Sequence, residues 1–283
     1  MIKIKYAIVI IILLLIAVFL YYQDNKLDVT RYRIQSEDIK DKVKILHLSD
    51  MHSKPFKKVL AQAQKIKPDL IMIIGDYVND RNRNKDKMLE FGRELTKISR
   101  VYYITGNHER RLENFEELMQ ELKGVGFNVL RDEMDSIEVK GSKINILGLD
   151  ENQASRQAYA DRKKGIFEYK DESALINELS RKDGFKIILS HFPENFEMIK
   201  EMNYVCYDFD LQLSGHAHGG QFILPLIGSV YSPGQGLFPK YAKGSFGTRP
   251  KLIISRGIGN AEFPFRLFNH PEIIVINLTR KLN

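Results

Sequence analysis

Two histidines, His216 and His218, stand two residues apart between glycines in the stretch SGHAHGGQ. The stretch follows the apolar run 209–213, so we expect it at the end of a strand. Residues i and i+2 of an extended backbone point the same way, so both imidazoles can converge on one spot. Neutral imidazole is the commonest metal ligand in proteins. Taken alone, this pair is compatible with a metal site or with a polar turn.

Polar side chains of the same kind follow other strand-like runs. They are Asp50, His52, Asp76, Asn79, Asn107, His108 and His191. Ligands of α/β proteins gather at the carboxyl ends of strands, where five of the seven histidines are thus expected. The other two, His47 and His270, are expected to be structural. Because Cys206 is the single cysteine and is expected in the core, the sequence predicts a metal site of nitrogen and oxygen ligands.

The segments that position these side chains alternate between strand and helix types. Short β-branched runs predict strands at 43–49, 70–74, 101–105, 144–148, 185–190, 252–255 and 273–277. Amphipathic patterns predict helices at 57–66, 85–98, 112–122 and 172–179. This alternation indicates a layered α/β fold. Segment 222–248, rich in glycine, proline and aromatic residues, is expected to be irregular and is either the wall of a substrate pocket or an ordinary packed loop.

The N-terminus carries a different signal. Residues 6–22 contain no charge and are just long enough to span a bilayer, with tyrosines near both ends. Lys3 and Lys5 precede the run, so the positive-inside rule predicts a cytoplasmic N-terminus and an extracytoplasmic domain. A cleaved signal peptide is disfavoured because LYYQDNK offers no small-x-small cleavage site. We therefore expect an anchor at 1–23, a juxtamembrane stalk at 24–42 and a catalytic domain at 43–283.

The formal net charge of +7 and pI near 9.2 favour polyanionic surroundings such as phospholipid, wall polymer or nucleic acid. The basic runs 81–85 and 162–164 interleave with acids and lack clustered aromatics. A solvated helix face explains them better than a nucleic-acid site, so nucleic acid is not the expected partner. Basic residues near a bilayer can equally meet anionic headgroups.

The motifs D-x-H, G-D-x-x-N, G-N-H-E, S-H and G-H-x-H, in this order, resemble those of the calcineurin-like metallophosphoesterase superfamily. The resemblance covers about residues 43–277. Within that superfamily, GHAHGGQ, SRGIG and PFRLFNHPEI resemble the membrane-associated bacterial phosphodiesterases. The resemblance implies an α/β fold, namely a four-layer αββα sandwich with two metal ions at the sheet edge, here preceded by one N-terminal transmembrane helix.

The resemblance also implies a set of ligands for each ion. One ion would be held by Asp50, His52, Asp76 and His218, and the other by Asp76, Asn107, His191 and His216. Two divalent ions about 3.5 to 4 Å apart can share a hydroxide, lower its pKa and neutralise charge on phosphoryl oxygens. This mixed donor set suits Mn, Fe or Zn.

His108 has a different implied role. In the family pattern the histidine after the ligand asparagine protonates the leaving oxygen as a general acid. Related phosphatases orient it with an aspartate three residues after the bridging aspartate, where this chain has Asn79. Asn79 can donate or accept a hydrogen bond but cannot stabilise an imidazolium by charge, so we expect weaker acid catalysis.

The expected function is that of a membrane-anchored dinuclear-metal phosphoesterase, foremost a phosphodiesterase that uses a metal-bridging hydroxide. One alternative is a hydrolase of lipid-linked UDP-sugar pyrophosphates, of the UDP-2,3-diacylglucosamine hydrolase type. Another is a non-catalytic scaffold of the same fold, which would be expected to have lost ligands. The substrate is expected to be a phosphodiester or a pyrophosphate, with lipid- or envelope-linked compounds among the candidates.

Overall fold

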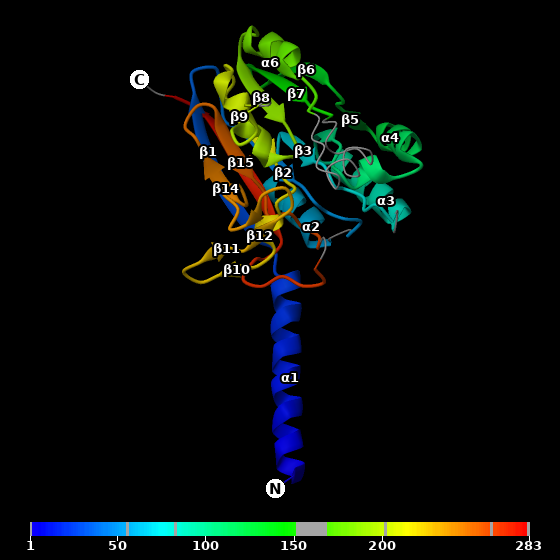
Figure 1. Ribbon diagram of the computed structural model, residues 1–283. Helices are drawn as coiled ribbons and strands as arrows, with labels where there is room; N and C mark the ends of the chain where they lie inside the picture. Colours follow the sequence, from blue (N-terminus) through cyan, green and yellow to red (C-terminus); the bar gives the residue numbers. More distant parts are fainter. Residues whose placement is uncertain are drawn as a thin grey trace.

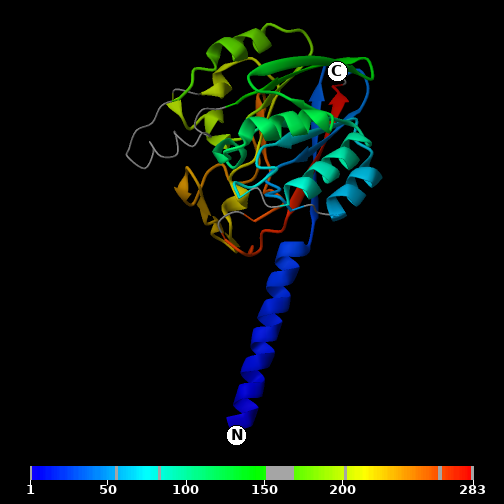
Figure 2. The same ribbon diagram turned by 90° about the vertical axis from the view of Figure 1, so that its right-hand side faces the viewer.

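A computed structural model describes residues 2–54, 57–81, 84–150, 169–200, 203–260 and 263–281. The basic run 162–164 lies outside these residues, and the run 81–85 lies partly outside them. The described chain forms two six-stranded sheets with helices on their outer faces and one long helix that extends from the domain (Figures 1 and 2).

The first sheet has the order β1-β16-β2-β3-β4-β5. Its strands are β1 (Asp28–Ser36), β16 (Glu272–Arg280), β2 (Val43–Leu48), β3 (Leu70–Ile74), β4 (Arg100–Ile104) and β5 (Phe127–Val129). All neighbours are parallel except β16 and β2. Side chains of helices α2 (Lys57–Ile66), α3 (Lys85–Thr96) and α4 (Phe115–Gly124) share a core with this sheet. These helices cover its outer face.

The second sheet has the order β14-β15-β9-β8-β7-β6. Its strands are β14 (Gly244–Phe246), β15 (Lys251–Ile254), β9 (Leu211–Ser214), β8 (Phe185–Leu189), β7 (Ser142–Gly148) and β6 (Glu133–Val139). Helix α6 (Ser173–Ser180) and the 3-10 helices η3 (Pro193–Phe196) and η5 (Tyr204–Cys206) pack on its outer face. A separate core lies between the two sheets. The four-layer αββα prediction is confirmed.

Strand β3 shows why the central strands read as continuous apolar runs. All five of its residues are buried. Leu70, Met72 and Ile74 face the second sheet, whereas Ile71 and Ile73 face the helices. Because successive side chains of a strand point to opposite faces, a strand with a core on each side needs apolar residues throughout.

Helix α1 (Ile2–Asn25) continues past the expected 6–22 and stands clear of the domain (Figure 1). It is long and apolar enough to cross a membrane, and its apolar residues are exposed. Unlike the core helices, it has no partner within the described domain along most of its length. The prediction of an N-terminal helix able to span a bilayer is confirmed in this sense.

The predicted stalk at 24–42 is wrong. Helix α1 reaches Asn25, and β1 then pairs in parallel with β16 over nine residue pairs. Ile34 is packed in the core between the sheets, while most other β1 side chains are partly or fully exposed. A strand at the sheet's edge with many solvated side chains carries too weak an apolar pattern to be recognised, and here it resembled a polar linker.

Segment 222–248 contains short strands rather than a wholly irregular path. It forms two hairpins, β10 (Ile223–Leu224) with β11 (Gly228–Ser229) and β12 (Tyr231–Ser232) with β13 (Gly236–Leu237), and ends in β14.

Cys206 is exposed, contrary to its expected core position. Its neighbours Tyr204 and Phe209 supply the apolar packing in this part of the chain.

Candidate metal centre

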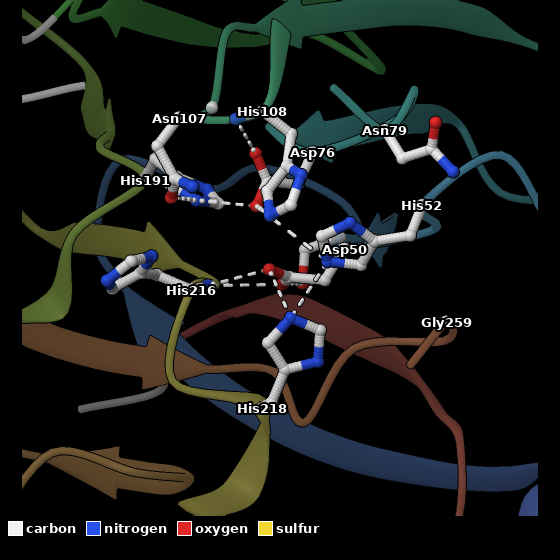
Figure 3. Close-up of polar contacts among 12 residues, drawn as sticks. Asp50, His52, Asp76, Asn79, Asn107, His108, His191, His216, His218 and Gly259 are labelled. Carbon is white, nitrogen blue, oxygen red and sulfur yellow. Dashed lines mark hydrogen bonds and ion pairs between the residues drawn. The ribbon is translucent and has the colours of Figure 1, made fainter. Parts of the chain in front are cut away.

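The predicted site residues meet where strands of both sheets end (Figure 3). Asp50 and His52 follow β2, Asp76 follows β3, and Asn107 and His108 follow β4. His191 follows β8, while His216 and His218 follow β9, with His218 opening the 3-10 helix η6 (His218–Gly220). The two sheets therefore deliver ligands to one place from opposite sides.

The backbone bends sharply at this place. Asp50, His52, Asp76, His216 and His218 all have positive φ angles, between 47° and 66°. Such a conformation costs about 1 kcal/mol or more for a residue with a side chain and persists only when surrounding contacts impose it. Here the amide of Asp50 donates to the carbonyl of Gly75 (3.1 Å), and that of His52 donates to the carbonyl of Asp76 (2.9 Å). The strained bends turn consecutive polar side chains toward the same point.

Asp76 lies at the centre of the cluster. Its Oδ2 is 3.4 Å from Nε2 of His191, 3.8 Å from Nε2 of His52 and 4.0 Å from Nε2 of His108. Its Oδ1 accepts a hydrogen bond from the amide of His108 (2.8 Å). One carboxylate thus faces histidines delivered by β2, β4 and β8.

A second carboxylate, Asp50, faces His218. Oδ1 of Asp50 is 3.3 Å from Nε2 of His218, and Oδ2 accepts a hydrogen bond from the hydroxyl of Ser49 (2.6 Å). The amide of His216 donates to both oxygens of Asp50. Nε2 of His52 lies 2.9 Å from Nε2 of His218. Two ring nitrogens and one carboxylate oxygen therefore converge, all of them buried.

His191 is held so that its Nε2 faces Asp76 and Asn107. Its Nδ1 lies 2.9 Å from the carbonyl of Ile74, to which an Nδ1–H donates. A carbonyl acceptor fixes this tautomer and leaves Nε2, which lies 3.3 Å from Oδ1 of Asn107, with a lone pair when the ring is neutral. The ring of His216 packs edge-on against His191 and Phe192 and belongs to none of the three groups of close ligand atoms found in the described chain.

The donors fit divalent cations. The three groups of His and Asp ligand atoms are Asp50–His52–His218, His52–Asp76–His108 and Asp50–Asp76–His191, with the atoms of each within 4.8 Å of one another. Burial, with the charge of His108, lowers the pKa of His52 to about 3, so its ring is neutral and offers a lone pair. Burial likewise holds the pKa of His218 well below its ordinary value.

The carboxylates attract positive charge to the same place. Burial alone would raise the pKa of Asp76, but the neighbouring His191 and His108 hold that pKa well below its ordinary value. Burial would conversely lower the pKa of His191, yet the charge of Asp76 raises it to about 10. Burial raises the pKa of Asp50 to about 6. A buried, acceptor-rich pocket of this kind needs a cation, and a bound metal would displace the proton from His191.

Gly106 is required by the close approach of two strand ends. A Cβ on this residue would lie 2.2 Å from Oδ1 of Asp76 and 2.4 Å from its backbone nitrogen. The β3 and β4 loops could not both keep their positions with any side chain there. The G-N-H-E motif therefore begins with glycine for a steric reason.

Three residues that contact the predicted site residues were not recognised from the sequence. The first is Glu109. Its side chain is fully buried, and its carboxylate accepts hydrogen bonds from the amides of Asp76, Gly106 and Val78, at 3.0, 3.0 and 2.8 Å. Burial and the charge of Asp76 raise the pKa of Glu109 to about 7. Glu109 thus clamps the loop of Asp76 to the loop of Asn107. Its place directly after N-H was the available signal, although sequence alone does not distinguish a buried acid from an exposed one.

Asp80 is the second. Its Oδ1 lies 3.4 Å from Nδ1 of His108. Asn79 is the residue that was predicted to support His108. Its backbone amide donates to the hydroxyl of Ser53, and its side-chain Oδ1 accepts a hydrogen bond from the backbone amide of Arg81. Burial would lower the pKa of His108, but the carboxylates of Asp76 and Asp80 raise it. A carboxylate therefore stands beside His108, one residue later in the chain than the family pattern suggested.

Arg266 is the third. Its guanidinium is buried, and Nη2 lies 3.4 Å from Nδ1 of His218. Nη1 donates to the carbonyl of Arg256 (2.9 Å), and Nε donates to Oδ1 of Asn260 (3.1 Å). The arginine therefore fixes the loop that lies behind His218.

The two histidines expected to be structural lie apart from the metal groups: His47 is in β2, and His270 contacts Asp28 at 3.2 Å.

Comparison with known proteins places this geometry in a family. Residues 43–220 match the family model described as calcineurin-like phosphoesterase. An uncharacterized metallophosphoesterase of Aquifex aeolicus (strain VF5) is 27% identical over 96% of this chain and 99% of its own length. Phosphodiesterase YaeI of Escherichia coli (strain K12) is 27% identical over 83% of this chain and 82% of its own.

A solved structure shares the fold. A putative 5'-nucleotidase from Staphylococcus aureus superimposes with a TM-score of 0.51 at 12% identity, covering 77% of this chain and 49% of that one. This chain thus spans about half the length of that structure. The family model covers well over half of this sequence, and its match includes all of the strand ends that carry the predicted ligands. The chain belongs to the calcineurin-like phosphoesterase family and is a metal-dependent phosphoric ester hydrolase.

Proposed function

We propose that this protein is a membrane-anchored phosphodiesterase with two divalent metal ions. The observation that carries the proposal is the position of Asp76, whose Oδ2 faces histidines from three different strand ends. A carboxylate with two oxygens at the centre of the donor set is suited to bridge two ions. The name of the E. coli relative, a phosphodiesterase, supports a diester as the substrate.

The proposed ligands are those of the family pattern. Asp50, His52, Asp76 and His218 would hold one ion, and Asp76, Asn107, His191 and His216 the other. The ring of His216 packs against His191 and Phe192 and lies outside the three groups of close ligand atoms in the described chain. Two ions of Mn, Fe or Zn would supply an activated water and neutralise charge on the phosphoryl oxygens.

His108 is proposed as the proton donor to the leaving oxygen. Its side chain is about one-fifth exposed, in contrast to the more deeply buried His52 and His191, so it can meet a substrate. Asp76 and Asp80 favour its protonated form. The backbone amide of His108 donates to Oδ1 of Asp76, which holds the ring beside the proposed metal ligands. A positioned general acid of this kind contributes about 10²- to 10⁴-fold.

Helix α1 is proposed as the membrane anchor, with the domain on the extracytoplasmic side because Lys3 and Lys5 precede the apolar run. An anchored enzyme is suited to lipid- or envelope-linked substrates, including the pyrophosphates of lipid-linked UDP-sugars. The non-catalytic alternative is disfavoured because every predicted ligand type is retained.

Metal analysis of three purified variants tests the proposal. Asp76→Ala should lose both ions, whereas His218→Ala should chiefly lose one. His270→Asn, which changes a histidine outside the site, should keep both. The protein with its metals should hydrolyse bis(nitrophenyl) phosphate faster than nitrophenyl phosphate.

Two results would contradict the proposal. Full occupancy by two ions in Asp76→Ala would refute the bridging role. A clear preference for the monoester would make the enzyme a phosphomonoesterase.

A further inference from the structure

The exposed large apolar side chains of the domain gather in two neighbouring segments. In the described residues after helix α1 they are Leu226, Ile227, Leu237, Phe238, Phe263 and Phe268, with Met198 as the exception. Leu226, between β10 and β11, is completely exposed. Surface apolar residues scattered singly are ordinary, whereas a group of them on one surface indicates an interaction site.

Contacts join the two segments into one surface. Phe222 forms a β-bridge with Leu267, and its ring lies 5.1 Å from that of Phe263. Ile227 and Phe238 line the same surface depression. We call the residues Leu226, Ile227, Phe238, Phe263 and Phe268 the apolar collar. In Figures 1 and 2 the hairpin β10–β11 and the loop before β16 lie at the end of the domain from which α1 leaves.

The contact between the collar and helix α1 indicates how deep the collar would lie in a bilayer. The ring of Phe268 packs edge-on against Phe19 of α1 at 5.8 Å. Phe19 precedes Tyr22, the last residue of the apolar run 6–22, by three positions, or about 4.5 Å along a helix. If α1 spans a bilayer, Phe268 lies below the top of the apolar run, at the depth of the acyl chains nearest the headgroups.

Lysine side chains lie around the C-terminal end of helix α1, beyond the level of Phe19. Nζ of Lys54 donates to the carbonyl of Asp24 (3.2 Å), Nζ of Lys58 donates to that of Asn25 (2.7 Å), and Lys26 lies over the ring of Tyr22. These lysines surround the end of the helix where phospholipid headgroups would begin. The apolar side chains would thus face the acyl chains of an anionic leaflet, and the lysines would face its headgroups.

The metal centre is close to the same level. The amide of Arg266 donates to Oδ1 of Asp24 at the end of α1 (2.8 Å), while its guanidinium lies beside His218 (3.4 Å). The length of one arginine side chain therefore separates the last turn of the helix from a metal ligand. A phosphoryl group bound at the site would sit near headgroup height.

We propose that the apolar collar inserts into the leaflet in which α1 ends and seats the metal centre at the level of the lipid headgroups. The occupant of this surface is the bilayer itself, and the proposal rests on the proposed role of α1 as an anchor. Phosphodiesters carried by lipids would then reach the site without leaving the membrane.

The chain contains no tryptophan, so a single introduced tryptophan reports its own environment. The full-length variants Leu226→Trp, Ile227→Trp and Phe19→Trp are reconstituted into vesicles of phosphatidylethanolamine and phosphatidylglycerol, with or without brominated acyl chains. Bromine quenches only those indoles that lie within the acyl region. Met198→Trp is the matched control, because its exposed apolar residue lies outside the collar. Circular dichroism checks that each variant is folded.

Leu226→Trp and Ile227→Trp should lose emission to an extent comparable with Phe19→Trp, and Met198→Trp should lose none. Quenching of Phe19→Trp without quenching of the two collar probes would overturn the collar while leaving the anchor intact. Failure to quench Phe19→Trp would overturn the anchor itself. Blue-shifted but unquenched emission of Leu226→Trp would show that protein, such as a second copy of the chain, covers this surface, which also contradicts the proposal.

Discussion

His108 illustrates how much of this site depends on single neighbouring charges. Its imidazole stands between Asp76, the proposed bridging ligand, and Asp80, which is about one-third exposed. The carboxylate of Asp80 also lies 3.9 Å from Arg111, so its charge is shared. The proposed general acid therefore has a neighbouring negative charge, which solvent and the arginine moderate.

His108→Ala should retain its metals and much of its activity on nitrophenyl diesters, because a nitrophenolate leaves without a proton. On alkyl diesters it should lose about 10²- to 10⁴-fold, since an alkoxide needs the acid. Asp80→Asn should show the same dependence on the leaving group with a smaller loss, about tenfold, because removing this carboxylate lowers the pKa of His108 and leaves less of the acid protonated. Rates on both substrate types, with metal content measured in parallel, check this.

Asn79→Ala is the matched comparison for Asp80→Asn. If Asn79→Ala rather than Asp80→Asn impairs alkyl diesters selectively, the partner predicted from the family pattern is the true one. Loss of metal from His108→Ala would make that histidine a ligand, as its place in one of the three ligand groups permits.

Among the elements, β1 shows that the segment after helix α1 belongs to the first sheet. It covers the edge of β16 and buries Ile34 between the sheets. Asp28, its first residue, accepts from Arg256 at 3.1 Å, and Arg256 also donates to Glu272 of β16 at 3.0 Å. The segment that follows helix α1 is thus part of the sheet, and two residues link α1 to β1.

A chain shortened to begin at Lys26 should therefore fold, whereas one beginning at Val43 should be strongly destabilised. The second chain loses β1, exposes the edge of β16 and removes Ile34 from the core. In the full-length protein, Ile34→Ala should lower the free energy of unfolding by about 2 kcal/mol, the low end for a core isoleucine, because the site is near the sheet edge. Denaturant unfolding followed by circular dichroism measures both effects. Equal stability of the two shortened chains would show that β1 contributes little.

At the scale of the whole molecule, the helix, the collar and the metal centre lie at one end of the domain. Arg266 connects all three, since its amide contacts Asp24, its guanidinium contacts the region of His218, and its loop carries Phe268. Movement of α1 relative to the domain would therefore shift Arg266 and, through it, the surroundings of His218. If helix α1 is the proposed anchor, its contacts place it to orient the site as well.

The single cysteine tests the predicted orientation. Cys206 is exposed and lies on the domain, so in intact protoplasts it should react with a membrane-impermeant maleimide. Cys206→Ser controls for labelling of other groups, and lysed protoplasts show the full extent of reaction. Labelling that appears only after lysis would place the domain in the cytoplasm, opposite to the prediction from Lys3 and Lys5.

Much of this protein follows from local sequence alone. The strand β3 and the helix α2 lie at the residues predicted, because a strand between two cores must be apolar throughout and a helix on a sheet must be apolar on one face. The clustering of Asp50, His52, Asp76 and His218 also follows, since the carboxyl ends of neighbouring strands meet at one edge. The expected convergence of His216 with His218 does not follow, because the backbone there has positive φ angles instead of an extended conformation. The family motifs record these local requirements.

The tertiary structure decided the rest. Oδ1 of Asp80 lies 3.4 Å from Nδ1 of His108, the carboxylate of Glu109 accepts hydrogen bonds from two loops, and Arg266 reaches His218 from 48 positions away along the chain. The strand β1 pairs with β16 across more than 240 residues. Each of these depends on which distant segments come together, and neither the polarity nor the spacing of a short stretch encodes its partner. Burial brings an acid such as Glu109 or an arginine such as Arg266 into contact with the candidate site, and burial is a property of the fold.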